Sequence, residues 1–485
     1  MGRRKKNYTI IIASIVAVII LGIAGIFTYQ WVTHTGLFRI PGQLIFADSV
    51  PAEQREIMQT ATADLKLDHN VTVNLTETIA MQPGGLLYDV LVPTTDFYNP
   101  ITSIDLNSAQ EYPLISIADI TPDIKALALD DVYYFDQLDR GAFFQYLSLD
   151  GDESDITKIT STVAPLLPTF PTKDTLLSFA QTGVTALSRG MNAKLDQVGN
   201  ASYFAEKIGP YLSSFDLTHT SNESSFSSQA NSRNICSKPG MIDALTSIGI
   251  DIIELTGNHN QDCGDQDAIS TIQQYREMNL QLVGGGKTAD AAAVPLTIDT
   301  KGAHITLLGY NLSTGGYTLA DTPGANFYTK EKALADISAA KARGDFIIVD
   351  VQYYECSSYV FETENTICDA ADSAAGDQVG FFRELINMGA DVVVGTAAHQ
   401  PQTYELYGDG VIYYGLGNLF FDQSWWPGTT RSLILAHYFW NGQHLQTRIV
   451  PTMYDNNLQP ELLDSAKAEW FINRLNQVRP KEAKS

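Results

Sequence analysis

The second half of the chain alternates short apolar runs with helical patterns, and this alternation limits the possible folds more than any other feature. Apolar runs occur at 176–180, 250–255, 346–352 and 391–394. Segments with helical periodicity lie at 239–247, 265–278, 331–343 and 377–388. Such an alternation is typical of layered sheets covered by helices. The sequence therefore predicts an α/β fold with α+β layering.

The beginning of the chain has the pattern of a membrane-spanning helix. Basic residues at 3–6 precede an uncharged run at 10–27. About 20 apolar residues cross a bilayer, and basic residues stay on its cytoplasmic side. We therefore predict a basic cytoplasmic tip at 1–7 and a single transmembrane helix at 8–31, with the rest of the chain extracytoplasmic at the cell membrane. A cleaved signal peptide is the alternative, although its apolar region is usually about 7–15 residues long.

Composition divides the remaining chain into two expected domains. Residues 32–41 form a short linker, and the Pro-rich stretch 164–173 resists both helix and sheet. Between them, 42–163 mixes a helical pattern with strand-like runs, which predicts a smaller α+β domain. The second domain is expected at 174–457, followed by a C-terminal helix and tail at 458–485.

The chain is strongly acidic, with a formal net charge of −24. Such a surface repels the phosphate backbone, so no nucleic-acid partner is expected. A charge of this size also serves solubility alone, without implying a specific partner.

All cysteines lie beyond the predicted transmembrane helix, at Cys236, Cys263, Cys356 and Cys368. An even number in an exported chain indicates disulfides, although sequence alone leaves the pairing open. We favour Cys356 with Cys368, which closes a short loop, and Cys236 with Cys263. A four-cysteine zinc site is disfavoured because no Cys-x-x-Cys pair is present.

Polar residues gather where the predicted strands end. These clusters cover 183–190, 216–223, 257–264 and 395–402, with a weaker one at 350–355. The carboxyl ends of strands are where α/β proteins carry their chemistry. In 257–264, Asn258 offers a neutral ligand oxygen, and His259 can bind a metal or donate a proton. Each cluster alone is better explained as a polar turn or loop.

Taken in order, the clusters resemble the motifs of the CapA family, the poly-gamma-glutamate capsule synthesis proteins. Residues 183–189 look like Gly-Asp-x-x-x-x-Arg, and 216–223 like Asp-x-x-x-x-Asn-Leu-Glu. Residues 257–264 look like Asn-Asn-His-x-x-Asp-x-Gly, and 395–402 like Gly-x-His-Pro-His-x-x-Gln. Residues 416–420 are similar to the family's Ser-Leu-Gly-Asn-Phe, with Gly415 in place of its Ser. The resemblance implies a calcineurin-like, metallophosphoesterase-type sandwich.

The resemblance also implies a ligand set for one divalent metal, Mn²⁺ or Zn²⁺. Glu223, Asn258 and His399 would be its ligands. Gln352 follows a strand where the family has a His, and would be a weak, neutral ligand.

Several family ligands are replaced in this chain. Val184 stands where the first motif has an Asp, and Ala397 where the fourth has its first His. Ser221 stands where the second motif has an Asn, while Asn222 would face the opposite side of its strand. A two-metal centre holds its ions about 3.5–4 Å apart and needs anionic ligands. We therefore do not expect a dinuclear centre.

Three further residues receive roles from the resemblance. His259 would be the general acid of a catalytic site. Arg189, whose guanidinium suits carboxylate or phosphate, would contact the substrate together with Asn418. The structural alternative for Arg189 is an ordinary ion pair.

The function implied is extracytoplasmic biosynthesis of a capsule or cell-envelope polymer, with poly-gamma-glutamate the family's named product. An enzyme of this kind would catalyse metal-assisted hydrolysis or transfer. The alternative is a non-catalytic binding or scaffold protein with a degenerate metal site. A third possibility places ligand binding in the N-terminal domain. Implied partners are the membrane, an anionic envelope polymer or its precursor, and other capsule-synthesis membrane proteins.

Overall fold

A computed structural model describes residues 41–312, 315–318, 320–353, 377–424 and 427–480. The predicted transmembrane helix at 8–31 and the predicted Cys356–Cys368 disulfide fall outside these ranges, and both stay predictions. Within the ranges, no helix is both long and apolar enough to cross a bilayer.

Tertiary contacts divide the chain into two compact units. The smaller unit is Met1–Leu91 with Ala142–Phe170, and the larger is Val92–Gly141 with Pro171–Ser485. Residues 92–141 thus group with the larger unit, whereas the sequence suggested a continuous domain at 42–163.

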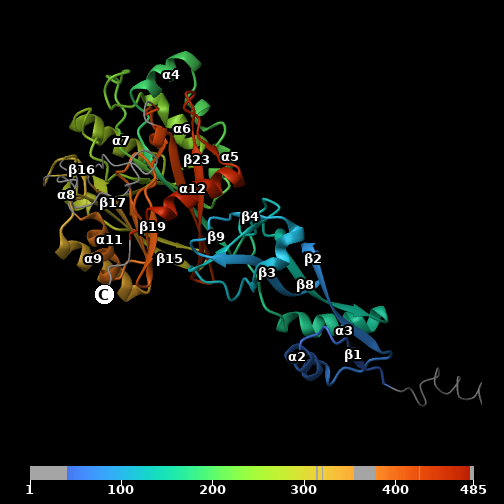
Figure 1. Ribbon diagram of the computed structural model, residues 1–485. Helices are drawn as coiled ribbons and strands as arrows, with labels where there is room; N and C mark the ends of the chain where they lie inside the picture. The colour runs from blue at the N-terminus through green and yellow to red at the C-terminus, as the bar shows by residue number, and fades with distance from the viewer. Residues whose placement is uncertain (1–40, 313–314, 319, 354–376, 425–426, 481–485) are drawn as a thin grey trace, which may run out of the picture. The chain divides into compact units, whose positions relative to one another are not determined.

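The smaller unit is a sheet of strand order β1-β2-β8-β3 with two helices (Figure 1). Its strands are β1 (Leu44–Phe46), β2 (Val71–Ala80), β3 (Leu86–Asp96) and β8 (Arg140–Asp150). Its helices are α2 (Ala52–Thr62) and α3 (Glu153–Val163), and α3 begins where the Asp152 side chain accepts the Ser154 N–H. Met58 and Ile159 from the helices pack with Val71 and Val73 from the sheet. The sequence predicts a helix at 51–65, which α2 confirms, and α3 is an addition.

One sheet of the larger unit has the order β12-β11-β10-β9-β22-β23-β24, with β21 beside β9. Its strands are β9 (Leu177–Thr185), β10 (Leu217–Asn222), β11 (Ile252–Glu254), β12 (Gln281–Val283), β21 (Asn418–Phe420), β22 (Arg431–Trp440), β23 (Gln443–Met453) and β24 (Glu461–Leu462). Strands β9 to β12 are parallel, and β22 pairs antiparallel with β9 and β23.

The other main sheet has the order β14-β15-β17-β18-β20-β19. Its strands are β14 (Leu296–Thr300), β15 (Ala303–Asn311), β17 (Phe346–Gln352), β18 (Val392–Gly395), β19 (Tyr404–Tyr407) and β20 (Gly410–Tyr413). Short pairs add β13 (Gly285–Gly286) to β16 (Gly324–Ala325), and β4 (Ser103–Ile104) to β7 (Ala128–Leu129). Strands β5 (Leu114–Ser116) and β6 (Ile124–Ala126) lie in the segment 92–141.

The two main sheets face one another across a shared core. Phe179 and Ile252 of the first sheet lie in the same apolar cluster as Ile348 and Val394 of the second. Helices cover the outer faces, α6 (Ile242–Ser247) and α7 (Asp265–Glu277) on the first sheet, α9 (Lys330–Arg343) and α11 (Gln378–Met388) on the second. Other helices are α4 (Gly190–Val198), α5 (Gly209–Leu212), α8 (Ala289–Ala292) and α12 (Ser465–Gln477). The fold is mixed α/β, as the alternation predicted.

The sequence also predicts a helix at 200–212 and a strand at 131–135, and both predictions are wrong. The helical pattern at 200–212 is broken into a 3-10 turn, Ala201–Ala205, and the short α5, because Pro210 cannot continue a preceding helix. The apolar run at 131–135 is a turn rather than a strand, since Asp130 and Asp131 both have positive φ, 50° and 63°.

Candidate functional site

The ends of neighbouring strands bring three predicted ligands together. Gln352, the last residue of β17, donates from Nε2 to Glu223 Oε1 over 2.9 Å and to Asn258 Oδ1 over 3.0 Å. Glu223 and Gln352 are buried, and Asn258 is half-buried. The Glu223 backbone N–H donates to the Thr185 carbonyl over 2.9 Å, which fixes the start of its loop against β9. We name Glu223, Asn258 and Gln352 the rim triad.

The rim triad does not fit a dinuclear metal centre. Gln352 Nε2 donates to Glu223 Oε1 and to Asn258 Oδ1, the two oxygens that a cation would otherwise bridge. An amide nitrogen is a hydrogen-bond donor and does not coordinate a cation. Glu223 is the triad's one carboxylate, so the charge of two divalent ions would be poorly compensated. Val184 and Ala397 are buried apolar side chains at the matched family ligand positions.

His399 and Asn418 form a second polar group. His399 Nδ1 lies 3.0 Å from Asn418 Oδ1, and its ring centroid is 5.2 Å from that of Phe421. Asn418 Nδ2 donates to Gln423 Oε1 and to the Thr429 carbonyl, each over 3.1 Å. Asn418 thus orients His399 and ties together the loop that follows β21.

Arg189 is paired inside the protein. Its Nε and its second amino nitrogen lie 3.0 and 2.7 Å from Asp422 Oδ1, and its guanidinium lies 4.3 Å from the Phe421 ring centroid. Asp422 Oδ2 also accepts the Gly190 N–H over 2.7 Å. The substrate contact predicted for Arg189 stays a prediction. In the structure, the Asp422 carboxylate compensates the charge of the Arg189 guanidinium. Sequence reasoning missed Asp422, whose signal was its position just after the motif at 416–420.

His259 has a carboxylate partner. Its Nδ1 lies 2.8 Å from Asp262 Oδ2, and the two side chains are 24% and 39% exposed. A carboxylate at one ring nitrogen orients the imidazole and sets which nitrogen carries the proton. The loop is anchored by Asn260, whose side-chain amide donates to the Leu255 and Gly257 carbonyls, each over 3.0 Å.

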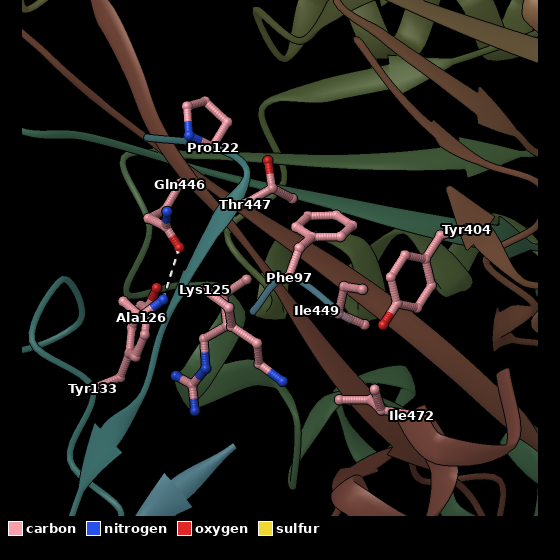
Figure 2. Close-up of a pocket in the computed structure, with 11 residues that line it drawn as sticks. Phe97, Pro122, Lys125, Ala126, Tyr133, Tyr404, Gln446, Thr447, Ile449 and Ile472 are labelled. Carbon is pink, nitrogen blue, oxygen red and sulfur yellow. Dashed lines mark hydrogen bonds between the residues drawn. The ribbon is translucent and has the colours of Figure 1, made fainter. Parts of the chain in front are cut away.

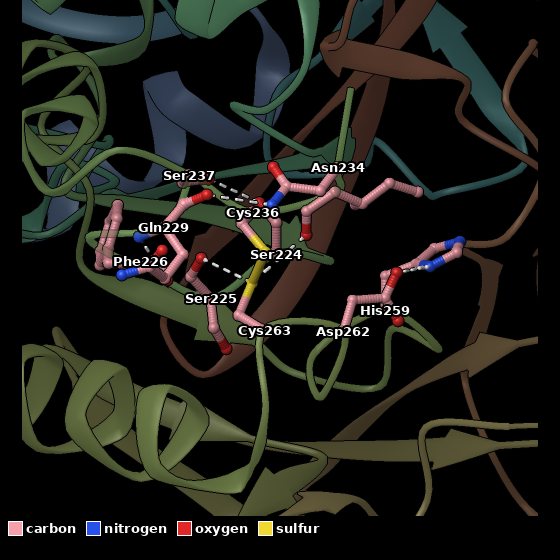
Figure 3. Close-up of a disulfide and its surroundings, with 12 residues drawn as sticks. Ser224, Ser225, Phe226, Gln229, Asn234, Cys236, Ser237, His259, Asp262 and Cys263 are labelled. Carbon is pink, nitrogen blue, oxygen red and sulfur yellow. Dashed lines mark hydrogen bonds and ion pairs between the residues drawn. A yellow bond between two sulfur atoms is a disulfide. The ribbon is translucent and has the colours of Figure 1, made fainter. Parts of the chain in front are cut away.

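The predicted Cys236–Cys263 disulfide is confirmed, and Figure 3 shows it beside the His259–Asp262 pair. It joins the loop that follows Glu223 to the loop that carries His259. Ser225 Oγ adds a bond of 2.6 Å to the Asn260 carbonyl. The two loops are therefore fixed to one another by a covalent bond and a hydrogen bond.

A second tier of polar residues lies between the sheets. Residues two positions apart on a strand face the same side, so Asp350 faces the same side as Gln352, and His219 the same side as Ser221. Glu254 ends β11 opposite Ser221 of β10. We name Glu254, Asp350 and His219 the inner cluster, and all three are fully buried.

The inner cluster is short of favourable charge partners. His219 Nε2 lies 3.5 Å from Asp350 Oδ2, and Asp350 Oδ1 accepts a hydrogen bond from Gln181. Glu254 Oε1 accepts the Thr256 N–H over 3.0 Å. Burial, followed by the charge of Asp350, raises the pKa of Glu254 well above its ordinary value. The signal in the sequence was a charged residue inside each buried apolar run.

Polar contacts continue from Gln181 deeper into the larger unit. His437 Nε2 lies 3.2 Å from Gln181 Oε1, and its Nδ1 lies 2.8 Å from Thr447 Oγ1. Burial lowers the pKa of His437 well below its ordinary value, so this ring is a neutral link. Thr447 in turn lines a cavity of about 30 Å³.

Figure 2 shows this cavity, with Phe97 and Tyr404 in its wall. The Ala126 backbone N–H donates a hydrogen bond to Gln446 Oε1. Burial lowers the pKa of the neighbouring Lys125 to about 7, and its Nζ donates to the Asn99 carbonyl over 2.8 Å. A volume of this size suits about one water molecule. The cavity is therefore a packing feature and not a polymer site.

Among all the residues that the structure describes, one group of His and acidic side chains has its ligand atoms close enough together to hold a metal ion, namely His69, Asp152 and Asp155 of the smaller unit. Asp155 Oδ2 accepts the N–H groups of Asp68 and His69 over 3.0 and 2.8 Å. Its Oδ1 accepts Lys158 Nζ over 2.8 Å. Since Lys158 already supplies the positive charge, this cluster is a structural ion pair.

Comparison with known proteins adds independent information. Residues 178–423 match the bacterial capsule synthesis protein family PGA_cap, which is half of the chain. The capsule biosynthesis protein CapA of Bacillus anthracis is 23% identical over 280 residues, covering 55% of this chain and 65% of that protein. The PGA biosynthesis protein CapA of Bacillus subtilis (strain 168) is 24% identical over 314 residues, covering 63% and 79%. The match thus spans less than two thirds of the Bacillus anthracis protein.

More distant similarities were also found. A probable polyglutamine synthesis accessory protein of Mycobacterium tuberculosis is 25% identical over 194 residues, covering 37% of this chain and 48% of that protein. The crystal structure of TT1561 of Thermus thermophilus aligns with 8% identity and a TM-score of 0.29, covering 55% of this chain and all of that one. A TM-score this low carries no weight for the fold. The match over residues 178–423, with its ordered strand-end motifs, places this chain in the bacterial capsule synthesis protein family PGA_cap.

Proposed function

We propose that this protein is a membrane-anchored, extracytoplasmic component of capsule or envelope polymer biosynthesis, whose rim triad binds a poly-gamma-glutamate-type chain or its precursor. Family membership and the names of the Bacillus relatives support the process. The Cys236–Cys263 disulfide supports an oxidising compartment. The uncharged run at 10–27 supports the anchor. Two facing sheets with helices outside support a metallophosphoesterase-like sandwich.

The observation that carries a binding role is the position of Gln352 Nε2 between Glu223 and Asn258. The triad presents amide and carboxylate groups, which are complementary to the amide backbone of a γ-glutamyl chain. The net charge of −24 opposes the approach of a polyanion. Binding by this surface should therefore strengthen when salt screens the repulsion.

The test is calorimetric titration of the full-length protein with a γ-glutamyl oligomer in EDTA. We expect binding that Gln352→Ala weakens at least about fivefold, as expected for one lost amide contact. Gln266→Ala, an amide exposed on α7, is the matched control and should bind like the unmodified protein. Binding that disappears in EDTA, or that ignores Gln352→Ala, would reject the proposal.

A second candidate function, metal-assisted hydrolysis or transfer, is favoured by the 2.8 Å contact between His259 and Asp262. In that case His259 is the general acid and Asp262 orients it. Glu223, Asn258 and His399 would hold the metal, which would polarise the scissile bond.

Turnover of the γ-glutamyl oligomer with Mn²⁺ or Zn²⁺ tests this candidate. His259→Ala should abolish turnover, and Asp262→Asn should lower kcat and shift its pH profile. His304→Ala is the matched control, because His304 is also exposed and also faces a carboxylate, that of Asp299 at 3.4 Å. An inactive unmodified protein eliminates the hydrolytic candidate and leaves the binding role.

A further inference from the structure

We propose that the Cys236–Cys263 disulfide is a redox-sensitive positioning bond. While the bond is intact, it holds the Asp262 carboxylate against the His259 ring, and a dithiol that reduces the bond releases Asp262. Cys263 directly follows Asp262 in the chain, and Figure 3 shows the disulfide beside the His259–Asp262 pair. The consequence for catalysis rests on the second candidate function, in which His259 is the general acid. The position of Asp262 can be measured without any activity.

Cys236 is fixed to the fold without the disulfide. Its carbonyl accepts a hydrogen bond of 2.8 Å from Asn192 Nδ2, and Asn192 is a fully buried residue of α4. Asn192 Oδ1 accepts the Lys238 N–H over 3.0 Å. Between them, the Ser237 N–H donates to the Ser225 carbonyl over 2.9 Å. Breaking the disulfide therefore leaves Cys236 in place.

The first part of the His259 loop, residues 257–260, is also held without the disulfide. The Asn260 side chain donates to two backbone carbonyls, and the Asn260 carbonyl accepts the Ser225 hydroxyl over 2.6 Å. Asn258 Oδ1 accepts Gln352 Nε2 over 3.0 Å. The rim triad should therefore keep its geometry when the disulfide is reduced.

The second part of the loop, residues 261–264, depends on the disulfide. Apart from the His259–Asp262 contact, its hydrogen bonds within the described part of the chain are turns of the loop, the first turn of α7 and a bond from Gln261 Nε2 to the Pro323 carbonyl. Turns inside a loop do not attach the loop to its surroundings. Asp262 is exposed, so little packing holds it. The disulfide is therefore the tie that keeps Asp262 in position.

The reduction is an ordinary thiol–disulfide exchange. Cys263 is half-buried and Cys236 is buried, so a dithiol reaches Cys263 Sγ first. Its thiolate attacks Cys263 Sγ, the bond between the two Sγ atoms breaks, and Cys236 leaves as a thiolate. The second thiol then attacks the mixed disulfide. The dithiol is oxidised to a disulfide, and its two electrons and two protons end on the cysteines.

The position of Asp262 decides the tautomer of His259. An ionised carboxylate only accepts hydrogen bonds, so Asp262 Oδ2 at 2.8 Å places the proton of the neutral His259 ring on Nδ1. Nε2 is then the nitrogen that exchanges a proton with a substrate. Release of Asp262 removes this preference and lets the ring adopt the Nε2–H tautomer. The disulfide therefore controls His259 through Asp262.

The experiment is NMR of the full-length protein with ¹⁵N-labelled histidine rings, at a pH where His259 is neutral and with its signals assigned by His259→Gln. We expect the ratio of the Nδ1–H to the Nε2–H tautomer to fall at least about fivefold after reduction with dithiothreitol, as expected for one lost hydrogen bond to a charged group. Cys236→Ser/Cys263→Ser should give the same ratio. Asp262→Ala should give it whether the disulfide is intact or reduced.

Two sets of histidine signals serve as controls. His304 also faces a carboxylate, that of Asp299 at 3.4 Å, but it lies in the β14–β15 pair rather than beside a disulfide, so its ratio should not change. The signals of the buried His219 and His437 should also stay unchanged, because reduction leaves the core folded. If Cys236→Ser/Cys263→Ser does not fold, reduction of folded Cys356→Ser/Cys368→Ser isolates the same bond.

A His259 ratio that ignores reduction would overturn the inference. Loss of the His219 and His437 signals on reduction would also overturn it, since the disulfide would then hold the fold and not one carboxylate. Binding of the γ-glutamyl oligomer in EDTA is a separate measurement and should be equal in oxidised and reduced protein. Its absence in both would reject the proposed function alone.

Discussion

Two clusters of acidic and imidazole groups invite comparison, the Asp155 cluster of the smaller unit and the inner cluster of the larger. Asp155 and Glu254 are both fully buried carboxylates. The pKa of Asp155 is nevertheless lowered to about 2, whereas that of Glu254 is raised well above its usual range. Burial raises the pKa of both carboxyl groups, so the direction of the net pKa shift is decided by the groups around each carboxylate.

The partners differ in charge and in donors. Asp155 opposes its desolvation with the Lys158 ammonium and the N–H groups of Asp68 and His69. Glu254 faces the charges of Asp350 and Glu223, and the donors Ser221 and Thr256 only partly offset them. A cluster with metal-like composition is thus complete in the smaller unit and undercompensated in the larger.

The largest expected effect follows removal of the complete cluster's carboxylate. Asp155→Ala should destabilise the smaller unit by about 3 kcal/mol, because two backbone donors and an ammonium lose their acceptor. The folded pKa of about 2 lies below the ordinary value of 3.8, so this stability is fully present above that value and lost as pH falls towards about 2. Hydrogen exchange of the Asp68 and His69 amides measures this loss of stability. The variant Asp64→Asn, at an exposed position, is the control. Equal exchange in variant and parent would contradict the compensation argument.

A smaller effect of opposite sign is expected when the carboxylate of Glu254 is removed. In EDTA, Glu254→Gln should stabilise the larger unit by about 1–2 kcal/mol, because it removes an undercompensated buried charge. The raised folded pKa means that the parent loses stability as pH rises above the ordinary value of 4.5, so the advantage of the variant should grow as pH rises above that value. Urea unfolding across this range measures it. Destabilisation at every pH would show that the carboxylate is well compensated.

The smallest effect should come from His69→Gln. The His69 side chain is 55% exposed, and its backbone N–H still reaches Asp155 after substitution. Stability should change by less than about 0.5 kcal/mol, as for other surface positions. Metal content should not change. Metal lost with His69 would mean that the Asp155 cluster binds an ion.

Sequence patterns predicted much of this molecule. Apolar runs located β11, β17 and β18, and the polar clusters after them located the rim triad and the His259 loop. The Cys236–Cys263 pair was also predicted correctly. Patterns failed where the outcome depended on partners distant in sequence, as for Arg189 with Asp422, or on local turn geometry, as at 131–135.

By itself, the sequence determined the alternation of strands and helices, the order of the strand-end motifs and the family, because these depend on periodicity and spacing along the chain. Only the tertiary structure decided that Gln352 Nε2 lies between Glu223 and Asn258, and that the buried His219 ring lies 3.5 Å from the buried Asp350 carboxylate. The physical reason is that charge compensation and hydrogen bonding act between atoms a few ångströms apart, and those neighbours come from strands far apart in the chain.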